Sequence, residues 1–347
     1  MDTIGNRWFD VSLPLDKPVD FLGVMYASPS TDVECGKLVL EAFIEDFRKL
    51  LWLTYRNGFD PLLDKEQIPT GITTDAGWGC SIRVSQMLVA QSILYCLEGR
   101  NRASINGSVA SLFMDSFSAP LSIHRMVHAG HARFGKRPSE WFGPTTGARA
   151  IEELINACSK EFKERGLGIL KSVSFDGGEI VSSRVSHLLK VGDIGVEGVI
   201  VLLTHRLGLE AFNYARYKGT IQSLFAHPFF QGLSSGESIA SAYYFFAASD
   251  DHLFYLDPHT VQPAFVDGSS QDSVPPQPKP LKMRWQRLNP SMTMGFVVRS
   301  IDEWKSLCDY LIKIDRELFD VTENQRDVTR FVDTVCDDET DEIVLIS

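Results

Sequence analysis

Apolar residues recur at helical spacing in three stretches of the chain. In the first, residues 38–51, the apolar side chains share one face and predict an amphipathic helix that runs toward Tyr55. Residues 80–97 carry apolar side chains on most faces, which predicts a buried helix that ends at Gly99. A third amphipathic helix is predicted to begin at Ser300, because Glu303 follows three residues later in the pattern of a capping box.

Stretches rich in β-branched and aromatic residues dominate the second half and predict strands. They are residues 198–204, 241–249, 252–265 and 293–299. Between the last two, "DGSSQDSVPPQPKP" is rich in Pro and Ser and predicts a loop without regular structure. A mostly helical front half followed by an antiparallel-looking sheet predicts an α+β fold.

The 347 residues suffice for one large domain or two modest ones. We expect one α+β domain over residues 20–320. The polar, mostly helical residues 100–190 are expected to form a small auxiliary subdomain inserted in it. Residues 321–347 are polar and acidic, which predicts a flexible tail.

The formal net charge is −11 and the sequence pI is about 5.2. Much of this acidity lies near the C-terminus, where Asp and Glu crowd residues 333–342. Nucleic-acid binding needs a basic surface, and no block of the sequence is rich in Lys or Arg. We therefore expect no nucleic-acid partner.

Neither export nor membrane insertion is predicted. "MDTIGNRWFDVSLPLDKP" lacks the basic start and apolar run of a secretory signal. The apolar run around "GVIVLL" is far shorter than the roughly 20 residues of a membrane span. The six cysteines are scattered without a Cys-x-x-Cys pair, which is typical of reduced thiols. We expect a cytoplasmic protein and, by default, a monomer.

Cys80 stands at the start of the predicted buried helix, after Gly77-Trp78-Gly79. The partial positive charge of a helix N-terminus stabilises a thiolate and lowers its pKa. Glycines on either side of Trp78 would allow a sharp turn and a close approach of a substrate. Cys80 is therefore a candidate nucleophile. The alternative is a small buried residue that happens to begin a helix.

A thiolate nucleophile needs a base and a group that orients the base. "YLDPHT" offers both: Asp257 and His259 are two residues apart in a β-like segment, so their side chains are predicted to leave the same face. Pro258 between them removes a ladder hydrogen bond, which places the pair at a strand end or edge. The alternative is an ordinary Asp-Pro turn.

Several blocks around these residues resemble, in the same order, the autophagins, the papain-like cysteine proteases of autophagy. The blocks are "FLGVMY", "LTYRNGF", "GWGCSIRVSQMLVAQSIL", "SIHRMVHAG", "EWFGPTTGA", "RLGLE", "YYFFAASDDHLFYLDPHTVQPA" and "LNPSMTMGFVV". The resemblance spans roughly Phe21 to Arg299. It implies a papain-like fold and a cysteine protease (hydrolase) that uses no cofactor.

The resemblance also implies roles for five residues. Cys80 matches the nucleophile, His259 the general base and acid, and Asp257 the residue that orients His259. Tyr55 matches a family tyrosine near the oxyanion, to which its hydroxyl and the Cys80 N–H would donate. Trp141 matches a family tryptophan at the entrance of the substrate cleft.

The implied substrate is the ubiquitin-like autophagy modifier, as precursor and as lipid conjugate. The enzyme would trim the modifier's C-terminus to expose a glycine and would cleave the amide joining that glycine to phosphatidylethanolamine. A membrane would then be met only through the lipidated substrate. Two alternatives stay open: a catalytically weak protein that binds the modifier, and a protease for another ubiquitin-like protein.

The sequence departs from the family at two places. The family has Gly-Gly-Lys-Pro in a loop that covers the active site, whereas this chain has "GLSSGESIASAYYF", and we expect the lid at Ser234–Ser238. Family tails often carry an aromatic-led motif that docks the modifier. Here Ile343 stands in the aromatic position and Ile346 at the second anchor, behind acidic residues.

Three histidines share the i, i+4, i+7 spacing of one helix face, a spacing that also suits zinc: His124, His128 and His131. Gly130 weakens a helix there, no acidic or Cys partner lies nearby in sequence, and a metal adds nothing to thiolate chemistry. We therefore expect no metal site.

Overall fold

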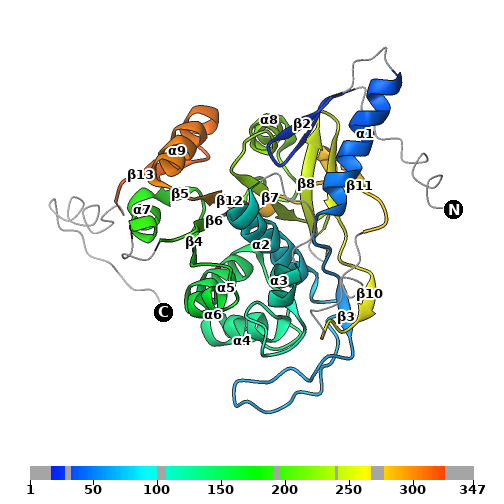
Figure 1. The fold of residues 1–347 in the computed structure, drawn as a ribbon, viewed down its shortest axis with the longest axis vertical. Coiled ribbons are helices and arrows are strands. Elements are labelled where there is room, and N and C mark those ends of the chain that lie inside the picture. Colours follow the sequence, from blue (N-terminus) through cyan, green and yellow to red (C-terminus); the bar gives the residue numbers. More distant parts are fainter. Residues whose placement is uncertain are drawn as a thin grey trace, which may run out of the picture.

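The structure is a computed structural model that describes residues 17–27, 33–99, 107–190, 195–238, 241–266 and 277–324. Its centre is a nine-stranded sheet with the order β11-β9-β8-β7-β12-β6-β4, to which β1 is added through β8 and β2 through β1 (Figure 1). Neighbours along this path are antiparallel, except that β4 and β6 are parallel. The sheet strands are β1 (Val19–Phe21), β2 (Val24–Tyr26), β4 (Leu170–Asp176), β6 (Gly198–Arg206), β7 (Phe230–Ser235), β8 (Tyr243–Ser249), β9 (His252–Leu256), β11 (Leu281–Arg284) and β12 (Ser291–Val298).

Two short parallel pairs accompany the main sheet. They are β3 (Tyr55–Asn57) with β10 (Val261–Pro263), and β5 (Glu179–Val181) with β13 (Asp320–Thr322). The helices are α1 (Val33–Arg48), α2 (Cys80–Glu98), α3 (Gly107–Ala110), α4 (Ile123–Phe134), α5 (Pro144–Ala157), α6 (Ser159–Glu164), α7 (Ser182–Lys190), α8 (Tyr214–Phe225) and α9 (Ile301–Asp315). The α+β prediction is confirmed.

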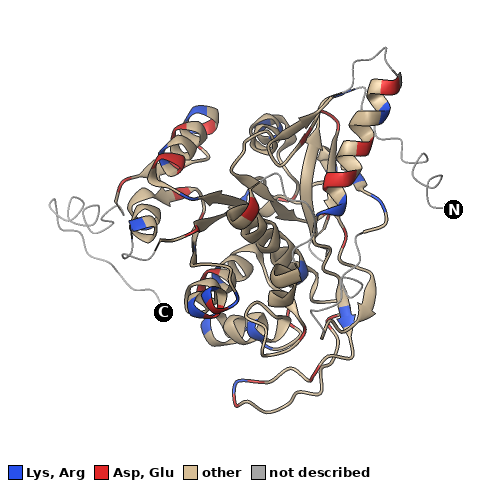
Figure 2. Ribbon diagram, viewed as in Figure 1, with Lys and Arg blue, Asp and Glu red and all other residues tan. Residues whose placement is uncertain are grey.

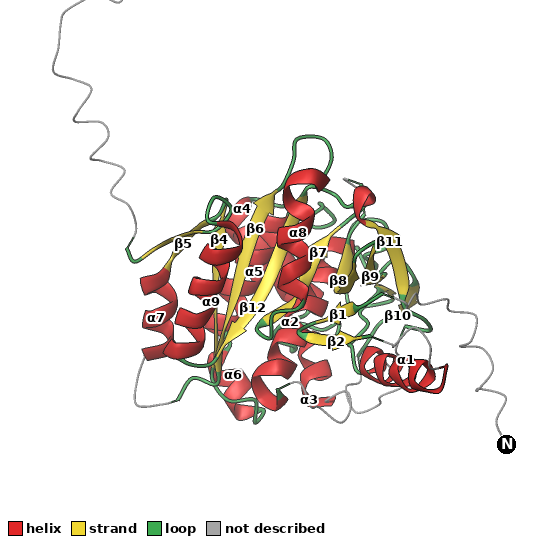
Figure 3. Cartoon of the chain, turned by 90° about the horizontal axis from the view of Figure 1, so that it is seen from above, coloured by secondary structure: helices red, strands yellow, loops and turns green. Residues whose placement is uncertain are grey.

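Helices cover both faces of the sheet. Figure 3 shows α2 and α5 on one side of the strands and α8 and α9 on the other. The contacts agree, since α2 packs on β7, β8 and β12, whereas α8 packs on β7 and β8 and α9 on β12. The result is three layers, and their apolar side chains form one continuous buried cluster.

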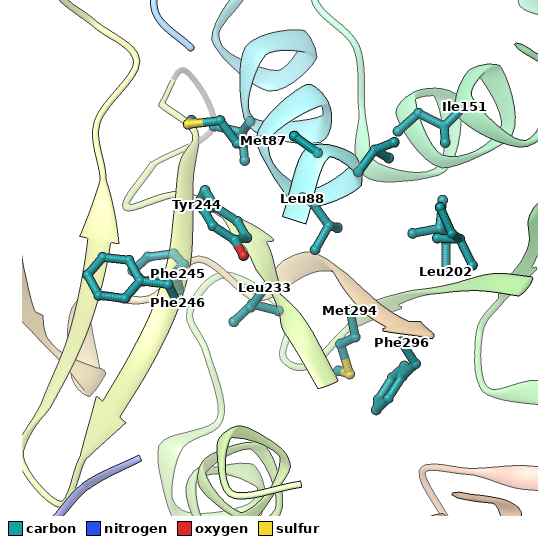
Figure 4. Close-up of a cluster of buried hydrophobic side chains, with 14 of the residues drawn as sticks. Met87, Leu88, Ile151, Leu202, Leu233, Tyr244, Phe245, Phe246, Met294 and Phe296 are labelled. Atoms are coloured by element: carbon teal, nitrogen blue, oxygen red, sulfur yellow. The ribbon is translucent and has the colours of Figure 1, made fainter. Parts of the chain in front are cut away.

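The helix α2 is the central helix of this core, as its sequence predicts. Figure 4 shows its Leu88 among the buried side chains that include Leu233 and Met294 of the sheet. A Cβ on Gly295 would lie 2.6 Å from Leu88, so only glycine lets β12 approach the helix this closely. By length and composition α2 could cross a membrane, but 83% of the apolar stretch is buried inside the protein.

The last helix begins with half of the predicted capping box. The Ser300 side chain accepts the N–H of Glu303 at 3.1 Å, as expected. The Glu303 carboxylate instead accepts the N–H of Arg299, one residue before the cap, at 2.7 Å. Its second oxygen binds the Arg299 guanidinium, which explains why the carboxylate turns away from Ser300.

The described part of residues 100–190 is not wholly helical, because β4 joins the main sheet there. Its sequence "LKSVSFD" has two serines at buried positions, so the sequence pattern indicated a polar segment rather than a buried strand. Both are satisfied within the fold: the Ser172 hydroxyl donates to Ile200 O, and the Ser174 hydroxyl donates to Glu152 of α5. Asn156 of α5 pairs with both backbone groups of Ser172, so α5 side chains cover the outer edge of the strand.

Charges of both signs are interleaved over the helices. Figure 2 shows Lys and Arg beside Asp and Glu on α1, α5 and α9. Mixed charges of this kind give a solvated face rather than a field of one sign. The predicted flexible tail, residues 321–347, is wrong at its start, because residues 321 and 322 belong to β13 and pair with β5. Residues 325–347, which include Cys336, Ile343 and Ile346, lie outside the described residues.

His205 on β6 makes the fold sensitive to acid. Burial lowers its pKa to about 4, against a smaller opposing effect of Asp176, and its ring stands edge-on to Phe319. The unfolded chain takes up this proton near pH 6.5, so the fold loses stability as pH falls from 6.5 to 4, by up to about 3 kcal/mol.

We therefore expect His205→Leu to flatten the pH dependence of unfolding between pH 6.5 and 4. Urea unfolding at several pH values measures this, with His128→Gln, a change of an exposed histidine on α4, as the control. Equal slopes in the wild type and in His205→Leu would contradict the assignment.

Candidate active site

Cys80 is the first residue of α2 and is only 1% exposed. The two glycines of Gly-Trp-Gly have different tasks. Gly77 adopts φ of +87°, the left-handed region that favours glycine. At Gly79 a Cβ would lie 2.5 Å from the Asp75 carboxylate, so this glycine makes room for a buried side chain of the protein rather than for a substrate.

A turn, and not the alternation of a strand, brings Asp257 and His259 together. The strand β9 ends at Leu256, and one Asp257 carboxylate oxygen accepts the backbone N–H of His259 at 3.0 Å and binds its Nδ1 at 2.6 Å. The prediction that both side chains leave one strand face is therefore wrong. An aspartate commonly closes such a turn with its own side chain. The prediction that the pair lies at a strand end is confirmed, because β9 ends at Leu256.

The fold brings this turn to the start of α2, although the two lie some 180 residues apart in the chain. The Cys80 thiol hydrogen-bonds to the side chains of both His259 and Tyr55. The rings of Tyr55 and His259 meet edge to face with centroids 5.4 Å apart. Tyr243 flanks the imidazole in the same manner at 5.5 Å. No sequence signal had pointed to Tyr243.

The electrostatics of the pair favour a thiolate and an imidazolium. Burial alone raises the pKa of Cys80, but the hydrogen bonds from His259 and Tyr55 and the charge of His259 outweigh it, so the net pKa is lowered. Burial alone lowers the pKa of His259, but the hydrogen bonds to Asp257 and Cys80 raise it to about 9. Near neutral pH the proton therefore resides on His259.

Asp257 and Tyr55 hold the protonation states that this ion pair needs. Burial opposes ionisation of Asp257, but its bonds to His259 lower the pKa, so the carboxylate stays charged. Burial and the neighbouring Cys80 raise the pKa of Tyr55. Its phenol therefore keeps its proton at neutral pH and remains a hydrogen-bond donor beside the sulfur.

Trp141 lies where the sequence places it, next to the nucleophile candidate. Its buried indole N–H makes no hydrogen bond of normal geometry, yet its interaction with Cys80 helps to lower the pKa of the thiol. Trp141 and Ser81 line a cavity of about 220 Å³. Phe142, Pro144 and Ala242 add apolar surface to it. A mostly apolar hollow beside a reactive side chain is the usual form of a ligand site.

The predicted lid, Ser234–Ser238, borders this cavity. The N–H groups of Glu237 and Ser238 both donate to the Ser241 hydroxyl, at 3.1 and 3.0 Å. The segment is anchored to the β12 side as well, because Gly236 O accepts the Asn289 N–H at 2.8 Å and Glu237 pairs with Arg287. Ser234 and Ser235 are the last residues of β7 and pair with β8 and β12, so only Gly236–Ser238 lies beyond the sheet, where these few polar bonds hold it.

Behind Cys80 lies a buried ion network that the sequence analysis missed. Arg83 of α2 pairs with Asp75 at 2.7 Å and with Asp115 at 2.8 Å, and all three side chains are at most 1% exposed. Asp75 also accepts the backbone N–H of Arg56 at 2.6 Å. One carboxylate thus ties the strand residue after Tyr55 to the first turn of α2. The one indication in the sequence was Arg83 itself, a charged residue within an otherwise apolar predicted helix, which suggests a buried acidic partner.

The remaining sequence candidates have structural roles. His124 Nε2 binds Asp60 O and His131 Nδ1 binds Lys136 O, both at 2.7 Å, whereas His128 is exposed. Across the residues that the structure describes, no three His, Cys, Asp or Glu side chains converge on a possible metal site. Burial raises the pKa of three other thiols, those of Cys96, Cys158 and Cys308.

Comparison with known proteins agrees with this arrangement. The family model of the peptidase C54 catalytic domain matches residues 40–310. A probable cysteine protease atg4 of Aspergillus oryzae is 32% identical over 295 residues, which are 76% of this chain and 70% of the relative. The cysteine protease atg4 of Emericella nidulans is 32% identical over 294 residues, 76% of this chain and 71% of the relative. The chain therefore belongs to the peptidase C54 family, the autophagins, and is a cysteine protease with a papain-like fold.

Proposed function

We propose that the chain trims the ubiquitin-like autophagy modifier after a glycine and releases the same glycine from phosphatidylethanolamine. The observation that carries this proposal is the hydrogen-bonded series Cys80–His259–Asp257 at the N-terminus of α2. Both reactions are acyl transfers from one glycyl carbonyl, so a single nucleophile serves both.

The proposed reaction assigns a role to each of these residues. The Cys80 thiolate attacks the glycyl carbonyl, and the Tyr55 hydroxyl and the Cys80 N–H donate to the oxyanion. The imidazolium of His259 protonates the leaving amine as the tetrahedral intermediate collapses to a thioester. Neutral His259 then takes a proton from the water that attacks the thioester. Collapse of this second tetrahedral intermediate expels the Cys80 thiolate and leaves the glycine carboxylic acid, which loses its proton to solvent, so the thiolate–imidazolium pair is restored. Asp257 orients the ring throughout.

Glycine at the cleavage point fits the covered position of the thiol. Cys80 is almost completely buried, and Trp141 and the lid segment Ser234–Ser238 border the hollow next to it. A residue without a side chain can bring its carbonyl through a narrow entrance where a larger residue would collide. We propose that Trp141 lines the substrate cleft and that the lid moves when the modifier enters.

The substrate assignment is tested with a panel of purified precursors. The protein is incubated with the autophagy modifier precursor, with ubiquitin extended at its C-terminus, and with the precursor of another ubiquitin-like protein. Lipid-conjugated modifier on vesicles forms a separate arm. We expect cleavage of the autophagy modifier in both forms. Preferential cleavage of another precursor would replace the substrate, and no cleavage of any would contradict the proposal.

The covered thiol also supports a second candidate, a weak enzyme that mainly holds the modifier. A modifier that carries a thiol-reactive group in place of its C-terminal glycine carboxylate separates the two. Rapid covalent labelling of Cys80 supports the protease. Tight binding without labelling supports the holding protein. In either case we propose a cytoplasmic monomer that meets membranes only through its lipidated substrate.

The pH profile of cleavage reports on the ion pair. The pKa of Cys80 is lowered and that of His259 is raised to about 9. We therefore expect kcat/KM to rise with pH as the thiol ionises and to fall near pH 9 as the imidazolium loses its proton. Asp257→Ala removes a hydrogen bond that raises the pKa of His259, so the alkaline limb should move to lower pH.

Asp251→Ala, at an exposed aspartate that pairs with Lys17, serves as the control for this profile. Its two limbs should coincide with those of the wild type. An unmoved alkaline limb in Asp257→Ala would show that this carboxylate does not set the pKa of His259.

A further inference from the structure

The main chain of Asp257 is held from both sides by side chains of distant segments. Its N–H donates to Gln277 Oε1 at 2.7 Å, and its carbonyl accepts the indole N–H of Trp52 at 2.7 Å. Trp52 lies 205 residues away in the sequence and Gln277 lies 20 away. Both backbone groups of this residue are therefore fixed by tertiary contacts, since β9 has already ended at Leu256.

Both holding side chains are themselves fixed. Gln277 is 5% exposed, and its amide donates to Lys279 O at 2.8 Å and to Tyr255 O at 3.4 Å. Trp52 is 7% exposed and belongs to the main apolar cluster. A buried polar side chain with all its bonds made has few alternative positions. The two therefore form a rigid bracket around the Asp257 peptide.

The same front segment also reaches the next residue of the turn. Tyr55 N–H donates to Pro258 O at 2.8 Å, which continues the parallel pairing of β3 with β10. Residues 52–55 thus bind two successive carbonyls of the turn, while the Tyr55 hydroxyl binds the thiol of Cys80. One short segment sets the place of the His259 turn relative to the nucleophile.

We propose that Trp52 and Gln277 are positioning residues that aim the Asp257 carboxylate, and through it the imidazole of His259, at Cys80. The inference rests on the roles proposed above for these three residues. Neither positioning residue is charged, and neither touches the thiol in any contact the structure gives. Trp52 and Gln277 act by fixing the orientation of the Asp257 peptide. One Asp257 carboxylate oxygen makes both bonds to His259, so a small rotation of this peptide disturbs both bonds at once.

Trp52→Phe and Gln277→Met test this, because each keeps an apolar body of similar size and removes the hydrogen bond to Asp257. We expect kcat to fall about 10- to 100-fold with KM changed less than threefold, because misplacing a reacting group by about 1 Å can cost 10²-fold. The pH profile of Cys80 alkylation by iodoacetamide should shift toward that of an ordinary thiol.

Two control variants match these changes away from the site. Trp285→Phe removes the buried indole bond to Ser249 O at 2.9 Å, and Gln231→Met removes the buried amide bond to Phe229 O at 3.0 Å. They should cost similar stability in urea unfolding and leave the alkylation profile unchanged. The inference would be overturned if Trp52→Phe and Gln277→Met kept the wild-type kcat and the wild-type pH profile of Cys80 alkylation. It would also be overturned if the two control variants changed kcat and the alkylation profile to the same extent.

The alkylation measurement separates this inference from the proposed function. If wild-type Cys80 is alkylated only at the pH of an ordinary thiol, the proposed ion pair is absent and the proposed function fails. If the wild type shows the lowered pKa and both positioning variants retain it, only the positioning roles fail. Should Trp52→Phe not fold, Gln277→Met alone decides, because Gln277 lies in the segment before β11 and outside the main apolar cluster to which Trp52 belongs.

Discussion

Replacing Cys80 by alanine is expected to lower the rate of modifier cleavage by at least about 10⁴-fold, because removing a catalytic nucleophile in comparable hydrolases costs about 10⁶ in kcat. Alanine leaves the helix start intact, since Cys80 is buried and caps nothing with its side chain. The variant should therefore still bind the modifier. Gel assays of precursor cleavage and of lipid-conjugate release measure the rate, and a pull-down measures binding.

Cys308→Ala is the matched control for this change. Cys308 lies on α9, is 8% exposed, and burial raises the pKa of its thiol to about 12, so it should remain an inert thiol. Cleavage should stay within twofold of the wild type. Residual activity of Cys80→Ala within tenfold of the wild type would assign the chemistry to another residue.

Arg83→Met is expected to destabilise the protein by about 3–5 kcal/mol, because it removes the guanidinium that pairs with two buried carboxylates, although the buried Arg56 still interacts with both. Burial alone lowers the pKa of Arg83, but Asp115 and Asp75 outweigh it and raise the pKa, so the side chain is charged in the fold. Methionine keeps most of the volume of the side chain. The loss of stability therefore comes mainly from the missing charge rather than from lost packing. Urea unfolding measures this change in the free energy of unfolding.

Lys160→Met supplies the comparison at the surface. Lys160 pairs with Glu164 at 3.9 Å, and both side chains are largely exposed, so this pair should contribute less than about 0.5 kcal/mol. A loss in Arg83→Met that matches the loss in Lys160→Met would show that the buried network does not hold the start of α2. Arg83→Met should also slow cleavage, since Asp75 links Tyr55's neighbour Arg56 to this helix.

Local sequence patterns predicted the elements well where one face of the element is apolar. The helix from Cys80 appears where periodicity placed it, and the strand predicted at residues 293–299 is β12 (Ser291–Val298). The strand β4 was not predicted, because the hydrogen-bond partners of its buried serines lie in β6 and α5, which are distant in the sequence. A polar residue is read from sequence as exposed unless its partner is known.

For the site, the sequence indicated residue types but gave the wrong geometry for one pair. Asp257 and His259 were expected to share a strand face, and a turn closed by the aspartate joins them instead. The candidate residues Cys80, His259, Asp257, Tyr55 and Trp141 nevertheless converge in one place. Short motifs carry this information because a helix start and an Asp-Pro turn are local features.

By itself, the sequence determined the α+β fold class, the buried helix that opens with Cys80 and the chemistry that this thiol can perform. Only the tertiary structure decided how the pKa of Cys80 is lowered and what holds its partners in place. Burial alone would have raised the pKa of this thiol, and contacts from His259 and Tyr55 reverse that effect. Those contacts, the Asp75–Arg83–Asp115 network and the bracket around Asp257 join residues far apart in the chain, and local periodicity carries no record of such pairings.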